Sequence, residues 1–251
     1  MGRGADNPPM EFGRPARTPW HGFPDVLLHA EERTVKGHPD YRAAKAGDVP
    51  AARRLVEAML SERVVAALEA MVSDANPVLT SVHAYEAVGI NRIPAVLAEV
   101  LAERLGIRAE ESVVQTNRTG HTGASGYHRL AYPALFDGEV ELGRAYVLVD
   151  DFVGQGGTLA NLKGFIENKG GRAILATTLT GKPYSARLTP AEAAVRALRA
   201  KHGDQLETWW KETFGYGFED LTESEARYLE RADSLDRIRD RLAAARQEAD
   251  D

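Results

Sequence analysis

Residues 145–180 read AYVLVDDFVGQGGTLANLKGFIENKGGRAILATTLT, and the order of these segments decides the fold class. An apolar run is followed by two acids and a glycine-rich turn. A segment with helical spacing comes next, and a second apolar run follows a Gly-Gly pair. Strands buried on both faces read as near-continuous apolar runs, and a helix between two such strands makes them parallel with a right-handed crossover. The stretch therefore predicts a β-α-β unit within a mostly parallel sheet.

The flanking sequence extends this α/β pattern in both directions. Apolar residues recur at helical spacing from Asp48 to Met71 and predict one long amphipathic helix. The segment PVLTSV at 77–82 predicts a short buried strand, and a second helix is expected from Asn91, as its cap, to Gly106. We expect a Rossmann-like, mostly parallel sheet flanked by helices, with helical N- and C-terminal appendages.

Composition shifts divide the chain into three predicted regions. Residues 1–37 begin with many prolines and glycines and are expected to form a mobile N-terminal arm. Residues 38–183 hold the α/β core. Residues 184–251 contain two capping boxes and a highly charged tail, and we expect a helical hood over the core with the tail as a solvated helix face.

Overall composition excludes several classes of protein. The 251 residues are 43% hydrophobic and carry 31 Lys and Arg against 37 Asp and Glu, a formal charge of −6, so the whole chain is not an electrostatic binder of nucleic acid. With no cysteine there is no disulfide framework and no thiolate nucleophile. No apolar run approaches the roughly 18–20 residues of a membrane span, and the first residues lack the apolar core of a signal peptide. We expect a cytoplasmic protein.

The acids and glycines after the first apolar run are the main candidate site. Ligands of open α/β sheets bind outside the carboxyl ends of the strands, which is where Asp150 and Asp151 are expected. Residues 154–158 can turn backbone N–H groups inward at a helix N-terminus and form a cradle for a phosphate. Carboxylates accept hydroxyl protons and favour hard cations. A phosphorylated sugar, with magnesium on the same ligand, fits both halves of the site.

These residues carry a resemblance to a known family. The run VLVDDFVGQGGTL, residues 147–159, resembles the phosphoribosyl-pyrophosphate (PRPP) motif of type I phosphoribosyltransferases. VGINRIPAVLAEVLAERLG, residues 88–106, is similar to a helix of the ComF-like branch, and the resemblance extends over about residues 77–182. The chain departs from the family at Gly154 and Gln155, where Thr or Ser is usual. The resemblance implies that residues 38–183 are a phosphoribosyltransferase-like core.

The resemblance also implies roles for the candidate residues. Asp150 and Asp151 would be catalytic, hold the ribose hydroxyls and meet Mg²⁺ indirectly, through the ligand to which it binds. Carboxylates stabilise the cationic state at the anomeric carbon, while metal and cationic donors stabilise the departing pyrophosphate. The 5′-phosphate of PRPP would bind Gly154, Gln155, Gly156, Gly157 and Thr158.

Residues for the pyrophosphate and the acceptor lie elsewhere in the chain. The pyrophosphate would be bound by His83, Arg92, Arg118, His121 and Arg129, the last three from a glycine-dotted stretch at 116–137 without clear periodicity, expected to be a mobile loop. Arg92 reads equally well as a solvated first-turn residue. Lys182 and Tyr184 are the candidates for acceptor binding, against the alternative of an ordinary strand-to-helix turn.

Other chemistries find less support. The histidines form no short zinc-ligand pattern, and the sequence around Ser125 lacks the final glycine of a hydrolase elbow. An aromatic group in the C-terminal third is expected to be core rather than a base-stacking surface: Trp209, Trp210, Phe214, Tyr216, Phe218 and Tyr228.

The resemblance thus implies Mg²⁺-dependent transfer of a phosphoribosyl group from PRPP to a nitrogenous acceptor, expected to be a nucleobase, with release of pyrophosphate. Two alternatives stay open: a non-catalytic PRPP-binding sensor, and a ComF-like role in DNA handling through a partner or the basic loop around Arg118. The resemblance implies a homodimer.

Overall fold

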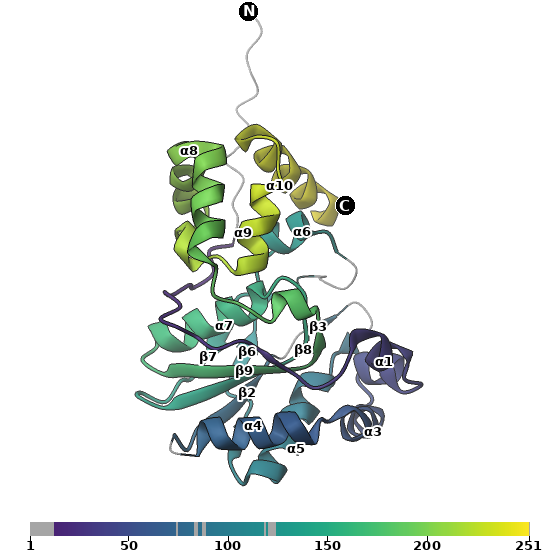
Figure 1. Ribbon diagram of the computed structural model, residues 1–251. Coiled ribbons are helices and arrows are strands. Elements are labelled where there is room, and N and C mark those ends of the chain that lie inside the picture. The colour runs from purple at the N-terminus through teal and green to yellow at the C-terminus, as the bar shows by residue number, and fades with distance from the viewer. Residues whose placement is uncertain are drawn as a thin grey trace, which may run out of the picture.

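A parallel sheet forms the centre of the molecule (Figure 1). The computed structural model describes residues 13–73, 75–82, 85–86, 89–117, 119 and 124–250. Within them five strands lie in the order β1–β9–β8–β2–β5, and each adjacent pair is parallel. The predicted mostly parallel sheet flanked by helices is confirmed. The strand bounds are β1 (Leu27–Leu28), β2 (Val78–Ser81), β5 (Arg108–Glu110), β8 (Ala145–Val153) and β9 (Arg172–Gly181).

The predicted β-α-β unit consists of β8, helix α7 (Gly157–Asn168) and β9. Successive side chains of a strand point to opposite faces, and β8 divides its residues accordingly. Val147 and Val149 pack into the core under one face, whereas Tyr146 and Leu148 pack into the core under α7. Both faces of β8 are therefore covered, which explains the unbroken apolar run at 145–149.

Helices α3 (Val49–Met59), α4 (Glu62–Val72) and α5 (Ile93–Leu105) cover the face opposite α7. The prediction of one long helix over Asp48–Met71 was wrong. Leu60 adopts an extended conformation, and the Ser61 hydroxyl accepts a hydrogen bond from the Val64 N–H, which starts α4. Apolar periodicity continues across this break because both helices face the same core, so periodicity alone did not reveal it. Helix α5 ends at Gly106 as expected.

The described part of the predicted N-terminal arm, residues 13–37, is packed rather than mobile. Trp20 and Phe23 are buried in the core on the α7 side, and β1 joins the edge of the sheet beside β9. Helix α1 (Glu32–Gly37) follows, and then α2 (Tyr41–Lys45). The prolines that suggested an arm also suit an extended segment held by tertiary contacts. Residues 1–12 lie outside the described residues.

The C-terminal third builds a separate core beyond α7. Its helices are α8 (Glu192–Phe214), interrupted at Gly203, α9 (Glu223–Glu230) and α10 (Leu235–Asp250), with the single turns η1 (Pro183–Ser185) and η2 (Phe218–Asp220). The short helix α6 (Gly126–Ala131) packs against α10. We call α6 and α8–α10 together the C-terminal helical unit. Trp210, Phe214 and Phe218 are buried at its centre, as the sequence predicted.

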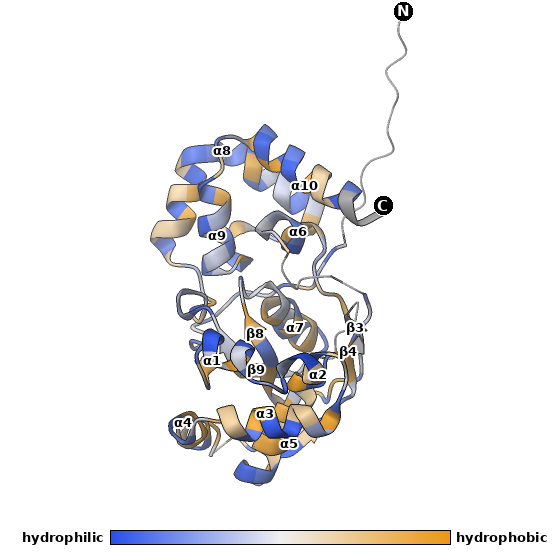
Figure 2. Cartoon of the chain, turned by 90° about the vertical axis from the view of Figure 1, so that its right-hand side faces the viewer, coloured by the Kyte–Doolittle hydropathy of each residue, from blue (hydrophilic) through white to orange (hydrophobic). Residues whose placement is uncertain are grey.

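The stretch 116–137 is more regular than predicted. It contains α6, and β7 (Phe136–Gly138) pairs antiparallel with β6 (Val113–Gln115). A second antiparallel pair joins β3 (Tyr85–Glu86) to β4 (Gly89–Ile90). These elements are too short for a periodic pattern, and β6 and β7 pair between segments on opposite sides of α6 in the chain. In Figure 2 hydrophobic residues gather along α3, α5 and β8, whereas α8 and α10 carry many hydrophilic residues. Across the described part of the chain, no helix has the length and hydropathy to cross a bilayer.

Candidate functional site at the carboxyl end of strand β8

The two acids at the end of β8 point to opposite faces of the sheet. Asp150 follows the face of Leu148, toward α7, and lines a cleft there. Asp151 follows the face of Val149, and its Oδ2 lies 3.0 Å from the Nζ of Lys45 in α2. The predicted pair is therefore adjacent in sequence but differently partnered, because strand geometry separates neighbouring side chains.

Lys45 is a site residue that the sequence did not reveal. It lies on a helix of five residues, 106 positions before Asp151, and both side chains of the ion pair are 12% exposed. No motif surrounds Lys45, so only the packing of α2 beside the sheet identifies it. Its ammonium group balances one of the two carboxylates.

Asp150 is 7% exposed, and its environment opposes ionisation. Burial raises its pKa well above the usual value, and the nearby charge of Asp151 raises it further. Asp150 Oδ1 still accepts a hydrogen bond from the Asp151 N–H at 2.8 Å. A buried carboxyl group of this kind binds hydroxyl donors or a cation, because either one lowers the free-energy cost of burying its negative charge.

The glycine-rich segment joins β8 directly to the start of α7. Gly156 is the N-cap of α7 with φ of +82°, a conformation that favours glycine, and no side chain caps the helix. A Cβ at Gly156 would lie 2.4 Å from the Leu188 side chain, so the position also lacks room for one. The first turn of α7 therefore presents backbone N–H groups, with their partial positive charge, beside Asp150.

A cleft runs along this segment. All five predicted phosphate-loop residues line it, together with Asp150 and Arg129. On the far side it is bounded by Tyr216 and Glu225 of the C-terminal third and by Arg17. The predicted loop and Asp150 thus lie together on this cleft, whereas its remaining wall comes from Arg17 and the C-terminal third.

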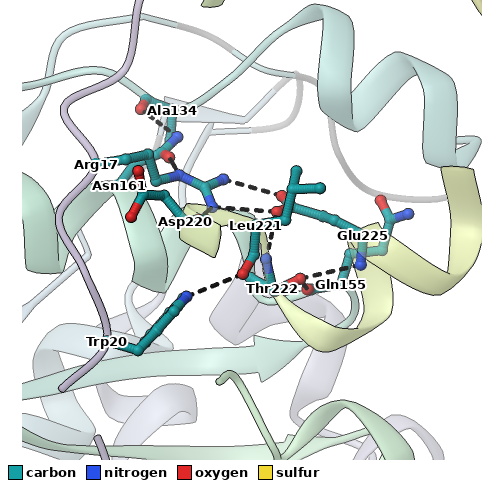
Figure 3. Close-up of polar contacts among 9 residues, drawn as sticks. All are labelled: Arg17, Trp20, Ala134, Gln155, Asn161, Asp220, Leu221, Thr222 and Glu225. Atoms are coloured by element: carbon teal, nitrogen blue, oxygen red, sulfur yellow. Dashed lines mark hydrogen bonds and ion pairs between the residues drawn. The ribbon is translucent and has the colours of Figure 1, made fainter. Parts of the chain in front are cut away.

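The C-terminal third braces the loop through its backbone (Figure 3). The Thr222 hydroxyl donates to the Gln155 carbonyl at 2.6 Å. The Ser185 hydroxyl, which lies outside that view, donates to the Gly154 carbonyl at 2.5 Å. Both bonds engage carbonyl oxygens, which leaves the N–H groups of the loop outside these contacts. The loop is held from the side that a bound anion would not use.

A buried arginine ties this region together (Figure 3). The Arg17 guanidinium pairs with the Glu225 carboxylate at 2.9 Å, donates to the Asp220 carbonyl at 2.9 Å and contacts the Asn161 side chain. Asn161 belongs to α7, so one side chain connects the N-terminal segment, α7 and α9. Composition gave no sign of this role, since Arg17 lies in the stretch interpreted as an arm.

Of the two predicted pyrophosphate-binding residues that the structure describes, Arg129 lines the cleft and Arg92 does not. Arg129 lies against the loop: a Cβ at Gly154 would be 2.8 Å from its Nη1. Arg92 is the N-cap residue of α5 and does not line the cleft. His83, Arg118 and His121 lie outside the described residues.

The two predicted acceptor-binding residues do not line the cleft either. Lys182 follows β9, and its Nζ pairs with Glu32 Oε2 at 2.7 Å. Tyr184 in η1 is 68% exposed. Their backbone does adjoin the loop, since the Lys182 N–H donates to the Val153 carbonyl at 2.9 Å. Their role in acceptor binding stays a prediction.

A magnesium ion would find partial coordination here. Within the described ranges no group of three or more His, Asp or Glu side chains is arranged to hold a metal. Asp150 and Asp151 supply hard oxygen donors, and Lys45 already engages one of them. The donor set fits an ion that is held mainly by ligand oxygens, and it does not form a cage of protein groups.

Comparison with curated proteins gives two relatives. The chain is 43% identical over 238 residues to Protein TraN of Escherichia coli, a match over 95% of this chain and 53% of that protein. It is 39% identical over 151 residues to an uncharacterized protein of Haemophilus influenzae, which covers 60% of this chain and 34% of the relative. The chain thus spans about half or less of the curated relatives it matches. No family model matches the sequence.

Solved structures that overlap the chain include phosphoribosyltransferases. A purine phosphoribosyltransferase from Pyrococcus horikoshii is 18% identical with a TM-score of 0.33, covering 49% of this chain and 75% of its own. An adenine phosphoribosyltransferase from Leishmania donovani is 14% identical with a TM-score of 0.33, covering 73% and 80%. Both scores are below 0.5. The ComF-like branch stays a prediction.

Proposed function

We propose that the cleft beside β8 binds PRPP and that the protein transfers the phosphoribosyl group to a nitrogenous acceptor, with release of pyrophosphate. The observation that carries the proposal is the placement of Asp150 and the glycine loop on one cleft. A carboxyl group next to a helix N-terminus suits a ligand with hydroxyl groups at one end and a phosphate at the other.

The proposed chemistry uses charge rather than a covalent nucleophile. Loss of pyrophosphate leaves positive charge on the anomeric carbon and the ring oxygen, and a carboxylate held nearby stabilises that charge. Asp150 would serve in this way, since a bound ligand favours its ionised form. Lys45 keeps Asp151 in a fixed orientation, and the loop at 154–158 would hold the terminal phosphate. Magnesium, when bound to the ligand, would neutralise the departing pyrophosphate.

A phosphorus NMR time course tests the proposal. PRPP and Mg²⁺ are incubated with the protein and a pooled set of nucleobases. We expect free pyrophosphate to appear only when protein and pool are both present. Replacing both acids, Asp150→Asn and Asp151→Asn, should lower the rate about 100-fold or more with the fold retained. The matched control is Asp137→Asn, because Asp137 is 74% exposed and lies away from the cleft.

The same experiment separates the two remaining interpretations. Broadened PRPP signals without turnover would contradict the transferase and favour a PRPP-binding sensor. Signals unchanged by the protein would contradict both. A role in DNA handling predicts a mobility shift of duplex DNA that falls steeply with salt, because binding to phosphates releases counterions. The acceptor, the homodimer and the cytoplasmic location stay predictions.

A further inference from the structure

Arg129 approaches the glycine loop from outside the sheet. It belongs to α6, which is part of the C-terminal helical unit, and its Nη1 lies at the place where a Gly154 Cβ would make a 2.8 Å contact. Arg129 and residues 154–158 line the same cleft. The guanidinium therefore stands at the phosphate loop, although the sequence suggested a role with the pyrophosphate.

The position of Arg129 is set by the packing of α6. The rings of Tyr127 and Tyr228 meet edge to face with centroids 4.9 Å apart, and the Tyr132 hydroxyl donates to the Arg246 carbonyl at 2.8 Å. Leu130, next to Arg129, is buried in the core of the C-terminal helical unit. Helices α9 and α10 thus fix α6, and α6 fixes the point from which Arg129 reaches the loop.

The surroundings of Arg129 favour an anion beside it. The side chain is partly buried, and burial lowers its pKa, which means that the charged form loses hydration there. Its Nε donates to the Ala124 carbonyl at 3.4 Å, a long bond. A guanidinium presents its donors as a planar fork that matches two phosphate oxygens. A phosphate bound in the loop would share the cleft with this fork.

We infer that Arg129 is the side-chain cation that binds the 5′-phosphate of the sugar ligand. The C-terminal helical unit holds Arg129 in the position that this contact needs. Backbone N–H groups of the loop and the Arg129 fork would bind the same phosphate from two sides. The inference rests on the proposed function, because it assumes that the loop receives a sugar phosphate. It also links docking of the C-terminal helical unit to phosphate affinity.

Calorimetric titration with ribose 5-phosphate tests this inference. We compare the wild type with Arg129→Gln, which removes the charge, and Arg129→Lys, which keeps the charge without the fork. The matched control is Arg196→Gln, an arginine of the same unit that is 69% exposed and pairs only at the surface with Glu192. We expect Arg129→Gln to weaken ribose 5-phosphate binding about tenfold to a hundredfold, as for a lost hydrogen bond to a charged group. The ribose 5-phosphate affinity of Arg129→Lys should lie between those of Arg129→Gln and the wild type. Arg196→Gln should bind ribose 5-phosphate as tightly as the wild type.

Inorganic pyrophosphate and melting curves separate the possible outcomes. If Arg129 serves the terminal phosphate, pyrophosphate affinity in the presence of Mg²⁺ changes less than ribose 5-phosphate affinity. A larger loss for pyrophosphate would overturn the inference and restore the role predicted from the sequence. Unchanged ribose 5-phosphate affinity in Arg129→Gln would also overturn it. If Arg129 had a merely structural role, Arg129→Gln would lower the melting temperature of the protein without ligand. We expect that temperature to stay unchanged and the rise in melting temperature caused by ribose 5-phosphate to become smaller. Failure of the wild type to bind ribose 5-phosphate would count against the proposed function itself.

Discussion

At the scale of single residues, Asp150 combines a cost in stability with a placement suited to function. Burial and the neighbouring carboxylate raise its pKa, so the folded state resists the ionisation that the unfolded chain undergoes freely. Stability should therefore fall as pH rises above the usual aspartate pKa of 3.8. Groups of this kind often mark functional sites, because a site needs charge in places where folding alone would avoid it.

Replacing Asp150 with Asn should separate these two effects. The amide keeps an oxygen that can accept the Asp151 N–H bond but carries no charge to bury. We expect Asp150→Asn to melt at the same or a higher temperature than the wild type at pH 7, while PRPP turnover is lost. Melting curves and the phosphorus NMR assay measure the two quantities. A lower melting temperature would show that the carboxylate stabilises the fold.

His29 provides a pH-dependent contribution outside the cleft. It is buried, its Nδ1 accepts the Ser61 N–H at 3.2 Å, and burial lowers its pKa from 6.5 to about 4. Because the folded pKa is the lower one, its contribution is complete above pH 6.5 and is lost as pH falls toward 4. In that window His29→Asn should reduce the slope of unfolding free energy against pH by about 1.4 kcal/mol per pH unit. Exposed His21, changed to Asn, is the control, and an identical slope in both variants would refute the assignment.

At the scale of elements, the junction between β8 and α7 depends on the glycine at the N-cap. Gly156→Ala would place a Cβ in the left-handed region and against Leu188, whereas Gly143→Ala meets a similar φ, +72°, with nothing within 4 Å. We expect Gly143→Ala to cost about 1 kcal/mol and Gly156→Ala about 2–4 kcal/mol, because only the second adds a clash to the strain. Urea denaturation of both variants measures the difference. Equal losses of unfolding free energy in the two variants would mean that the loop rearranges around the added Cβ at no cost in free energy.

The Arg17 connection is the second prediction at this scale. Arg17 and Glu225 are both 3% exposed, so removal of one partner leaves a buried charge unpaired. Arg17→Leu should lower the free energy of unfolding by about 3–5 kcal/mol. The surface pair of Arg196 and Glu192 is the comparison, and Arg196→Leu should stay within about 0.5 kcal/mol of the wild type. A small effect of Arg17→Leu would show that the N-terminal segment docks by other contacts.

At the scale of the whole molecule, the chain forms three hydrophobic cores. The sheet carries one on each side of its parallel strands, and the C-terminal helical unit adds its own. The N-terminal segment joins them, since the Trp20 indole N–H donates to the Leu221 carbonyl at 2.9 Å (Figure 3). The cleft therefore exists only when the C-terminal third is docked on the sheet.

The tryptophans offer a test of this cooperation. Trp20 lies in the core beside α7, whereas Trp209 and Trp210 belong to the C-terminal helical unit. Fluorescence of a Trp20→Phe variant reports the C-terminal helical unit, and a variant with both other tryptophans changed to Phe reports the sheet. The unfolding midpoint of each variant is also measured by circular dichroism, so that fluorescence is compared within the same variant. We expect fluorescence and circular dichroism to give coincident midpoints in each variant. Separate midpoints would mean that the C-terminal helical unit unfolds independently.

Local sequence determined the central unit of this protein. The apolar strands, Asp150 and the loop at 154–158 were predicted because they are contiguous, and the geometry of a strand followed by a helix fixes where they lie. The burial of the C-terminal aromatic residues was predicted as well, since large apolar side chains have few other stable locations.

Only the tertiary structure decided what surrounds that unit. Lys45 reaches Asp151 from 106 residues away, Arg17 closes the far wall of the cleft, and α6 carries Arg129 to the loop. Each of these cations lies in a short or irregular segment whose conformation is set by its contacts rather than by a periodic pattern. Spacing along the sequence determines the local conformation of contiguous residues, such as a strand followed by a loop and a helix. Burial and ion pairing between distant segments arise only when the chain is packed, and the packed chain decides which charges meet at the cleft.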